Sequence, residues 1–394
     1  AILFALLLIV VLFAVLYLKY RMNNAPDKKN LEAAIDAEVN KTMRSGLFPG
    51  IVVGVYKEGR TCIKGYGTVN KETAVIPDAT TAFQIGSVSK LLTASLLQAL
   101  CDEGVVSMEA TLDELIGGSM PLSPAAQSVT LKQLVTHTSG FPSIPKSLGD
   151  KASKMAGEDD PLLDPYSYLG PPFVFDYLAT TQDKRDPGRF EYSNFGMGLL
   201  GHVLEVVTGK SYETLVVEKV LAPLGMTRTA ITPTPEIKDR LAQGYTTKGA
   251  PTRPWTFAAL AGAGAFYSNA EDMLKFIQAN VEAGGAASQS FRKMREPQFG
   301  GDTGIGWLQP TFLHRFFANQ KVVWHNGMVG GYAAYLSIDA ETKTGVVILT
   351  NQASATDMLG MMLARQLRTQ SWSAHTPANF SLQKHASSQS GSHP

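Results

Sequence analysis

Apolar and polar residues follow several distinct patterns along this chain, and the first of them is a long apolar run. Residues 1–18 contain no charge, no glycine and no proline. As a helix this run would be about 27 Å long, close to the thickness of a bilayer core. Lys19 and Arg21 follow at once, as is expected at a membrane interface. We therefore predict a transmembrane anchor over residues 1–22, rather than a cleaved signal peptide, because no A-x-A-like cleavage site follows.

Strand and helix periods follow a short polar linker, residues 23–30. Residues 31–46 have apolar positions at helical spacing, and the runs PGIVVGVYK and TCIKGYGTV read as two strands joined by a turn. The helical period returns between Val88 and Gly104. The last third adds strand patterns over 304–309, 321–324, 331–338 and 344–350, and helical patterns over 269–281 and 353–367. The two ends of the domain are therefore expected to share one sheet.

The middle of the chain, from about residue 105 to residue 240, lacks clear strand patterns. Its helical patterns cover 131–136, 172–180, 195–207 and 211–221. We therefore predict an α/β (α+β) domain over residues 31–371, with a mostly antiparallel sheet flanked by helices and an inserted all-helical lobe. Residues 372–394 are rich in Ser, His, Gln and Pro, which predicts a disordered tail.

Composition limits the classes of partner. Of 394 residues, 44% are apolar and 18% are charged, so the chain can bury a sizeable core. The formal net charge is +1 and there is no basic stripe, so no nucleic-acid partner is expected. The seven histidines lack metal-ligand spacing and no phosphate-binding glycine motif is intact, so we predict no metal and no cofactor. Cys62 and Cys101 either pair or remain free thiols.

The first candidate for chemistry is FQIGSVSKLLTA, residues 83–94, in which Ser87 and Lys90 share one face of a predicted helix. A serine hydroxyl is a poor nucleophile until a neighbouring base takes its proton. Lysine can be that base if burial lowers its pKa from about 10.4. Ser-x-x-Lys is also an ordinary helix start with a solvated lysine, so the pair gains meaning only from its companions.

A second cluster, RFEYSNFG at residues 189–196, precedes a strong helical pattern. Tyr192 and Asn194 are two positions apart, so in an extended segment they point the same way. They can serve as a proton shuttle and a hydrogen-bond donor to substrate. Alternatively, they are a strand-end tyrosine and an asparagine helix cap.

The third cluster is VVWHNGMVGGYAAY, residues 322–335. A predicted strand carries His325, Asn326 and Gly327, and a glycine there lets a substrate backbone approach the strand edge. The alternative is a glycine-rich hairpin with an incidental histidine.

In this order and spacing, the three clusters resemble serine β-lactamases and penicillin-binding proteins, in their class C β-lactamase-like branch. Four further stretches are similar to that branch: LVTHTSGF (134–141), LAPLGMTRTA (221–230), GAGAFYSNAEDMLKF (262–276) and GVVILTN (345–351). The resemblance covers roughly residues 30 to 370 and implies the β-lactamase/transpeptidase-like fold.

The resemblance also implies residue roles. Ser87 would attack a carbonyl carbon and become acylated, while Lys90 and Tyr192 would share its proton and pass it to the leaving group. Asn194 would bind substrate and orient Lys90. The backbone N–H groups of Ser87 and Met328 would form the oxyanion hole.

His325-Asn326-Gly327 occupies the place of the family's substrate-binding Lys-Thr-Gly. Histidine is mostly neutral at pH 7, so an anionic substrate loses a fixed positive partner and efficient β-lactam hydrolysis is not expected. A histidine there is familiar among the family's esterases, D-aminopeptidases and mitochondrial-type proteases. Residues 143–172, a long proline-rich segment between the first two clusters, are expected to border the cleft and to help select substrates.

Together these observations predict a membrane-anchored serine hydrolase that cleaves an ester or amide through a Ser87 acyl-enzyme, of the esterase or peptidase type. A β-lactamase, a DD-peptidase and an acyltransferase remain alternatives, and a catalytically idle scaffold is the alternative from another class. The resemblance favours an extracytoplasmic catalytic domain, whereas Lys19 and Arg21 after the apolar run favour a cytosolic one, so the membrane side stays open. The oligomeric state stays open.

Overall fold

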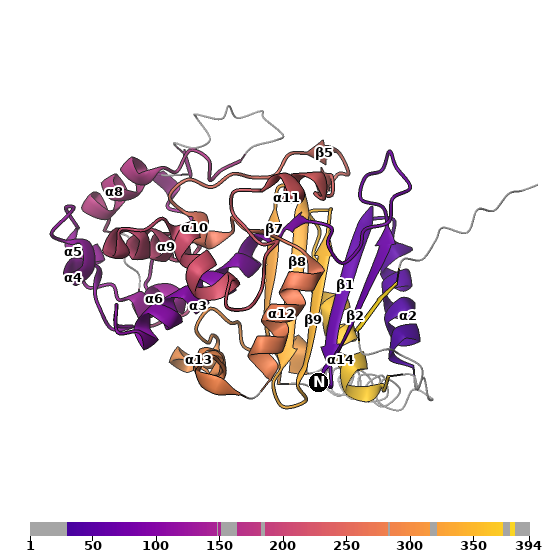
Figure 1. The fold of residues 1–394 in the computed structure, drawn as a ribbon. Helices are drawn as coiled ribbons and strands as arrows, with labels where there is room; N and C mark the ends of the chain where they lie inside the picture. The colour runs from indigo at the N-terminus through magenta and orange to yellow at the C-terminus, as the bar shows by residue number, and fades with distance from the viewer. Residues whose placement is uncertain are drawn as a thin grey trace, which may run out of the picture.

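A six-stranded sheet forms the centre of the fold in this computed structural model, which describes residues 30–147, 149–150, 164–182, 186–282, 284–315, 321–372 and 379–382. The strand order is β10-β2-β1-β9-β8-β7 (Figure 1). All neighbouring pairs are antiparallel except β10 and β2, which are parallel. The strands are β1 (Gly50–Lys57), β2 (Arg60–Gly67), β7 (Val323–Val329), β8 (Tyr332–Asp339), β9 (Thr344–Thr350) and β10 (Asn379–Leu382). The predicted mostly antiparallel sheet, built from both ends of the domain, is confirmed.

Both faces of the sheet are covered, which explains why β1 is buried along its whole length. Successive side chains of a strand point to opposite faces. Ile51, Val53 and Val55 therefore join one core, and Val52 and Tyr56 join the other. Helices α2 (Leu31–Met43) and α14 (Asp357–Thr369) cover the first face, and α12 (Ala270–Val281) covers the second (Figure 1).

A helical lobe packs beside the sheet, and the described part of residues 105–240 contains helices and no strand (Figure 1). Its helices are α4 (Leu112–Ile116), α5 (Pro124–Gln127), α6 (Leu131–Val135), α8 (Pro171–Thr180), α9 (Asn194–Thr208), α10 (Tyr212–Val216), the π-helical turn η2 (Val217–Leu221) and α11 (Pro235–Asp239). Helix α3 (Ser89–Asp102) buries most of its 14 residues, because it packs against both α9 of the lobe and α13 (Gly285–Arg295). The start of α3, which directly follows Ser87, therefore lies in the protein interior.

The predicted strand at residues 304–309 is wrong. Thr303 and Leu308 form only isolated bridges there. Gly306 has a φ of +76°, and a Cβ at this position would lie 2.5 Å from the Cβ of Ala94 on α3. The segment is therefore bent by close packing against α3, which its strand-like composition does not reveal.

The segment predicted to be a disordered tail contains a described strand. Asn379–Leu382 form β10, which pairs with β2 so that Phe380 lies opposite Cys62. Apolar residues alternate in this short run, and the backbone groups at the free edge of β2 provide partners. Apart from Trp372, the rest of residues 372–394 lies outside the described residues.

Residues 1–29, which include the predicted anchor and nearly all of the predicted linker, also lie outside the described residues. Within the part of the chain that is described, no helix combines the length and the apolar character needed to cross a bilayer. Cys62 and Cys101 are both free thiols, so the disulfide alternative is not formed.

Asn351, at the end of the GVVILTN motif, holds three strand ends together. Its buried Oδ1 accepts a hydrogen bond from Gly50 N (2.8 Å), and its Nδ2 donates to Thr68 O (3.2 Å) and Val69 O (3.1 Å). This asparagine is therefore a structural residue: it supplies hydrogen bonds to backbone groups where β1 begins and where β2 and β9 end.

We expect Asn351→Ala to lower the free energy of unfolding by about 3 kcal/mol, because the buried Gly50 N–H and the part-buried oxygens of Thr68 and Val69 lose this partner. Urea denaturation measures the change. Asn40→Ala, on an exposed position of α2, is the matched control and should change stability by less than about 0.5 kcal/mol. Equal stability of the two variants would contradict the structural role of Asn351.

Candidate active site

Ser87 lies in a short 3₁₀ turn, η1 (Gly86–Val88), immediately before α3. This turn packs backbone to backbone against β7. A Cβ on Gly327 would lie 2.1 Å from Ile85 O and 2.8 Å from Ser87 N, and a Cβ on Gly86 would lie 2.7 Å from Met328 N. Only glycine fits at both contact points. The contact brings the N–H groups of Ser87 and Met328 into one neighbourhood, as the expected oxyanion hole requires.

Lys90 is fully buried, and its Nζ has three close oxygen neighbours. Nζ lies 2.9 Å from Ser87 Oγ, 2.7 Å from Asn194 Oδ1 and 2.6 Å from the backbone oxygen of Ala263. Burial lowers the pKa of Lys90 well below its usual 10.5. A neutral amine donates two hydrogen bonds and has one lone pair. In that neutral form, Asn194 Oδ1 and the Ala263 oxygen, which can only accept, would take both N–H groups and leave the lone pair toward Ser87 Oγ.

The Tyr192 ring lies between Lys90 and two histidines. Its centroid is 5.0 Å from Lys90 Nζ, 4.5 Å from the His137 ring and 6.1 Å from the His325 ring. Burial raises the pKa of Tyr192, and a hydrogen bond with Ser87 only partly opposes this rise. Tyr192 is therefore a neutral phenol beside the nucleophile. Of the two residues expected to share the Ser87 proton, Lys90 has its Nζ within hydrogen-bonding distance of Ser87 Oγ, and Tyr192 lies beside both as a phenol.

Asn194 is the first residue of α9, and the cap of that helix is Ser193. Ser193 Oγ accepts from Gly196 N (2.8 Å), while Ser193 N donates to His137 Nδ1 (3.1 Å). The alternative that made Asn194 a helix cap is therefore wrong. Capping by its neighbour leaves the Asn194 amide free to accept the hydrogen bond from Lys90.

His325 is fully buried and lies on the face of β7 that looks toward Tyr192 and Lys90. Its Nδ1 lies 2.6 Å from the backbone oxygen of Asn326. A carbonyl oxygen can only accept, so Nδ1 carries the proton, and Nε2, which has no hydrogen-bond partner among the described residues, carries a lone pair. Burial is the main cause that lowers the pKa of His325 to about 3, and a positive charge on Lys90, when present, acts in the same direction. The position that holds a lysine in the family thus holds a neutral ring, covered by protein rather than open to a substrate.

The structure places the Asn326 side chain away from this face. Side chains alternate along β7, and the Asn326 Nδ2 donates to Asp357 Oδ1 (2.9 Å) at the start of α14. The side chain expected to bind substrate therefore links β7 to α14. Gly327 allows the close contact between β7 and the serine turn, because it has no side chain.

Sequence reasoning missed one side chain near the site, Tyr166, and one backbone group, the Ala263 oxygen. Burial raises the pKa of Tyr166 to about 12, and a hydrogen bond with the Asn194 side chain opposes the rise. Tyr166 lies in the proline-rich segment, where no pattern marks it. Ala263 lies in GAGAFYSNAEDMLKF, so its motif was visible but its acceptor role was not. The ring of His137, in LVTHTSGF, packs against the ring of Tyr192.

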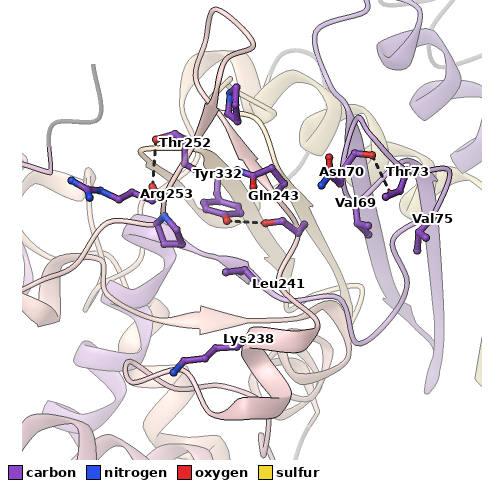
Figure 2. A pocket seen from close by; sticks show the side chains of 13 residues that line it. Val69, Asn70, Thr73, Val75, Lys238, Leu241, Gln243, Thr252, Arg253 and Tyr332 are labelled. Carbon is purple, nitrogen blue, oxygen red and sulfur yellow. Dashed lines mark hydrogen bonds between the residues drawn. The ribbon is translucent and has the colours of Figure 1, made fainter. Parts of the chain in front are cut away.

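A cavity of about 660 Å³ opens elsewhere, between residues 69–75 and 238–254 (Figure 2). Tyr332 forms part of its floor, and the Tyr332 hydroxyl donates to Ala242 O (2.8 Å). None of the predicted site residues lines this cavity. Among the described residues there is also no group of three or more His, Cys, Asp or Glu placed to hold a metal ion.

Comparison with known proteins places the chain in a family. The beta-lactamase family model matches residues 35–369. PbpX of Bacillus subtilis (strain 168) is 26% identical over 291 residues, covering 73% of this chain and 66% of PbpX. The D-alanyl-D-alanine-carboxypeptidase/endopeptidase AmpH of Escherichia coli (strain K12) is 25% identical over 339 residues, covering 79% of this chain and 82% of AmpH.

Among solved structures, the beta-lactamase/D-alanine carboxypeptidase from Pseudomonas syringae superposes with a TM-score of 0.73 at 21% identity, over 88% of this chain and 99% of that one. The site and fold define a serine hydrolase with a Ser-x-x-Lys nucleophile. The chain belongs to the beta-lactamase family, and the expected membership of the serine β-lactamase and penicillin-binding-protein superfamily is confirmed.

Gly327→Ala tests the contact between the serine turn and β7. We expect it to lower kcat/KM about 100-fold or more, because a Cβ 2.1 Å from Ile85 O pushes the turn away from β7 and separates the two oxyanion donors. Esterase kinetics and a thermal melt measure activity and folding together. Gly118→Ala, at an exposed site with open space around it, is the control and should leave both unchanged. Normal turnover by a folded Gly327→Ala protein would refute the proposed geometry.

His325→Gln tests the neutral state of the buried imidazole. Unfolded histidine has a pKa near 6.5, whereas that of His325 in the fold is about 3, so below pH 6.5 only the unfolded state gains this proton. Stability therefore falls as the pH falls, by about 1.4 kcal/mol per pH unit for this group. We expect the variant to lose that contribution between about pH 6 and pH 4. Urea denaturation over this range measures the slopes; parallel slopes for both proteins would contradict the assignment.

Proposed function

We propose that this chain hydrolyses an uncharged ester or amide through an acyl-enzyme on Ser87, as an esterase or a peptidase. The observation that supports the chemistry most directly is the buried contact between Lys90 Nζ and Ser87 Oγ, 2.9 Å long. In the proposed reaction Ser87 Oγ attacks the carbonyl carbon as its proton moves to Lys90. Lys90, with the neighbouring Tyr192 hydroxyl, returns that proton to the leaving group. Water then hydrolyses the acyl-enzyme by the same exchange.

The preference for uncharged substrates follows from the environment of His325. A substrate carboxylate beside β7 needs a positive partner, and this buried ring with a pKa of about 3 stays neutral in the physiological range. A charged hydrogen bond is worth about 1.5–3 kcal/mol, so its absence would disfavour anionic substrates about tenfold or more.

A D-alanyl peptidase or a β-lactamase is the second candidate, and the relatives favour it. AmpH carries the name of a D-alanyl-D-alanine-carboxypeptidase/endopeptidase, and it aligns with 79% of this chain. Such substrates end in a carboxylate, which the neutral His325 does not favour. An acyltransferase would use the same acyl-enzyme with a different acceptor. The idle-scaffold alternative is not retained, because the chain is a serine hydrolase with its nucleophile and base in contact.

We further propose that residues 1–18 anchor the enzyme in a membrane, with the catalytic domain on the extracytoplasmic side. The uncharged run and the flanking Lys19 and Arg21 support the anchor. The resemblance to penicillin-binding proteins supports the side. We also propose that the described start of the segment 143–172 borders the cleft, since Ser143 Oγ accepts from Asn194 Nδ2 (3.4 Å); residues 148 and 151–163 of that segment lie outside the described residues.

Intact-mass spectrometry of the full chain in detergent tests the proposal. The protein is treated separately with a fluorophosphonate, with benzylpenicillin and with benzylpenicillin methyl ester, which differs only in its masked carboxylate. We expect a fluorophosphonate adduct that Ser87→Ala abolishes, and about tenfold faster acylation by the methyl ester than by the free acid. No adduct with any reagent would overturn the hydrolase mechanism. Faster reaction with the free acid would instead favour the penicillin-binding or β-lactamase alternative.

A further inference from the structure

His137 lies just after α6, at a type of helix end where glycine is the usual residue. His137 N donates to Leu134 O (3.3 Å) and Thr138 N donates to Gln133 O (2.9 Å), the two hydrogen bonds that define a Schellman motif. The backbone of His137 is left-handed, with a φ of +58°. This conformation is costly for a residue with a Cβ, and glycine or asparagine avoids most of the cost. The contacts of the His137 side chain must therefore offset backbone strain.

Those contacts surround Tyr192. The residues before and after Tyr192 both bond to this one histidine: Glu191 N donates to His137 O (2.7 Å), and Ser193 N donates to His137 Nδ1 (3.1 Å). In an extended segment, N–H groups two residues apart point the same way, so both can meet the same partner. The imidazole also packs on the Tyr192 ring, with centroids 4.5 Å apart and planes inclined by 35°. One residue therefore holds both the backbone and the ring of Tyr192.

The contact with Ser193 N fixes the chemical state of the imidazole. A backbone N–H can only donate, so Nδ1 carries a lone pair and the ring proton is on Nε2. The His137 side chain is buried, and burial lowers its pKa well below 6.5, so the ring keeps this accepting form at neutral pH. The side chain thus presents one defined acceptor to the backbone next to Tyr192.

We propose that His137 is a positioning residue: its Nδ1 acceptor holds the backbone at Ser193 so that the Tyr192 hydroxyl can deliver a proton to the leaving group. The Tyr192 ring centroid lies 5.0 Å from Lys90 Nζ, so a small turn of the backbone would move the phenol away from the reacting groups. Without the acceptor, the buried Ser193 N–H has to find another partner, and the chain shifts to do so. This inference rests on the proposed acyl-enzyme mechanism and adds a residue to it.

Two variants that suit the left-handed backbone separate this role from folding. Asparagine and glycine are the residues that this helix position usually holds, so neither adds strain. His137→Asn keeps an acceptor, because its Oδ1 is bonded to Cγ as Nδ1 is in histidine, whereas His137→Gly removes the acceptor. Lys343→Gly is the matched control, because Lys343 is also left-handed (φ +50°) and lies in the turn between β8 and β9.

Two esters with the same acyl group give a readout that is specific for proton delivery. p-Nitrophenyl butyrate releases a stabilised phenolate that leaves without a proton, whereas ethyl butyrate releases an ethoxide that must be protonated as it leaves. The readouts are kcat/KM for both esters, measured on the full chain in detergent, with Tm as the measure of folding. A purely structural role of His137 would lower the activity on both esters by the same factor.

We expect His137→Gly to lower kcat/KM about tenfold more for ethyl butyrate than for p-nitrophenyl butyrate, because only the poor leaving group depends on general acid catalysis. His137→Asn and Lys343→Gly should keep the wild-type ratio of the two kcat/KM values. Equal losses on the two esters in His137→Gly would overturn the proposal. So would a change of the ratio in His137→Asn as large as that in His137→Gly, because the acceptor would then not be the cause.

A second readout does not depend on activity. In crystals of His137→Gly we expect the Tyr192 ring, whose centroid is 5.0 Å from Lys90 Nζ here, to move away from Lys90, whereas His137→Asn should keep this distance. An unmoved ring in His137→Gly would overturn the positioning role. Failure of the wild-type protein to hydrolyse either ester or to form any Ser87 adduct would instead count against the proposed function, and the crystal structures would then decide the role of His137 alone.

Discussion

The burial of Lys90 is the constraint on which the rest of the site depends. A lysine side chain with no exposed surface cannot keep its charge cheaply, so it must be neutral or surrounded by acceptors. Lys90 meets both conditions: its pKa lies well below its usual value, and its Nζ contacts Asn194 Oδ1 and Ala263 O. Those acceptors come from the start of α9 and from the 3₁₀ turn η3 (Ala261–Ala263). Both elements must therefore pack against α3 if the two acceptors are to reach the buried lysine.

Most of the fold could be predicted from local patterns because its sheet and main helices have clear periods. The run PGIVVGVYK reads as a strand, and its two-sided burial follows from the alternation of Ile51 and Val53 with Val52. The failure at residues 304–309 arose because Gly306 packs against a helix far away in sequence. Pairing of β10 with β2 depends on an available edge, which is likewise a tertiary property.

The site was predictable where a residue type dictates its chemistry. Ser87, Lys90, Tyr192 and Asn194 do lie together, because a nucleophile, a base and their polar neighbours must occupy fixed positions in the motifs. The role of Asn326 could not be assigned from its motif alone, because the direction of a strand side chain depends on the strand register. In the register observed, the Asn326 side chain faces Asp357. Tyr166 could not be found, because an irregular loop carries it and only the folded chain brings it to Asn194.

Burial disfavours charge throughout the resting site, and this has a consequence for the proposed reaction. Lys90, His137 and His325 are all shifted by burial toward their neutral forms, and Tyr192 is shifted toward its neutral phenol. In the proposed reaction, an ammonium would form on Lys90 and an oxyanion would form near Ser87 N and Met328 N. Acceptors for the ammonium, and donors for the oxyanion, are already in position before either charge exists. Interactions that strengthen only in the transition state raise kcat, so the exclusion of a resting charge is itself part of how this site can catalyse acyl transfer.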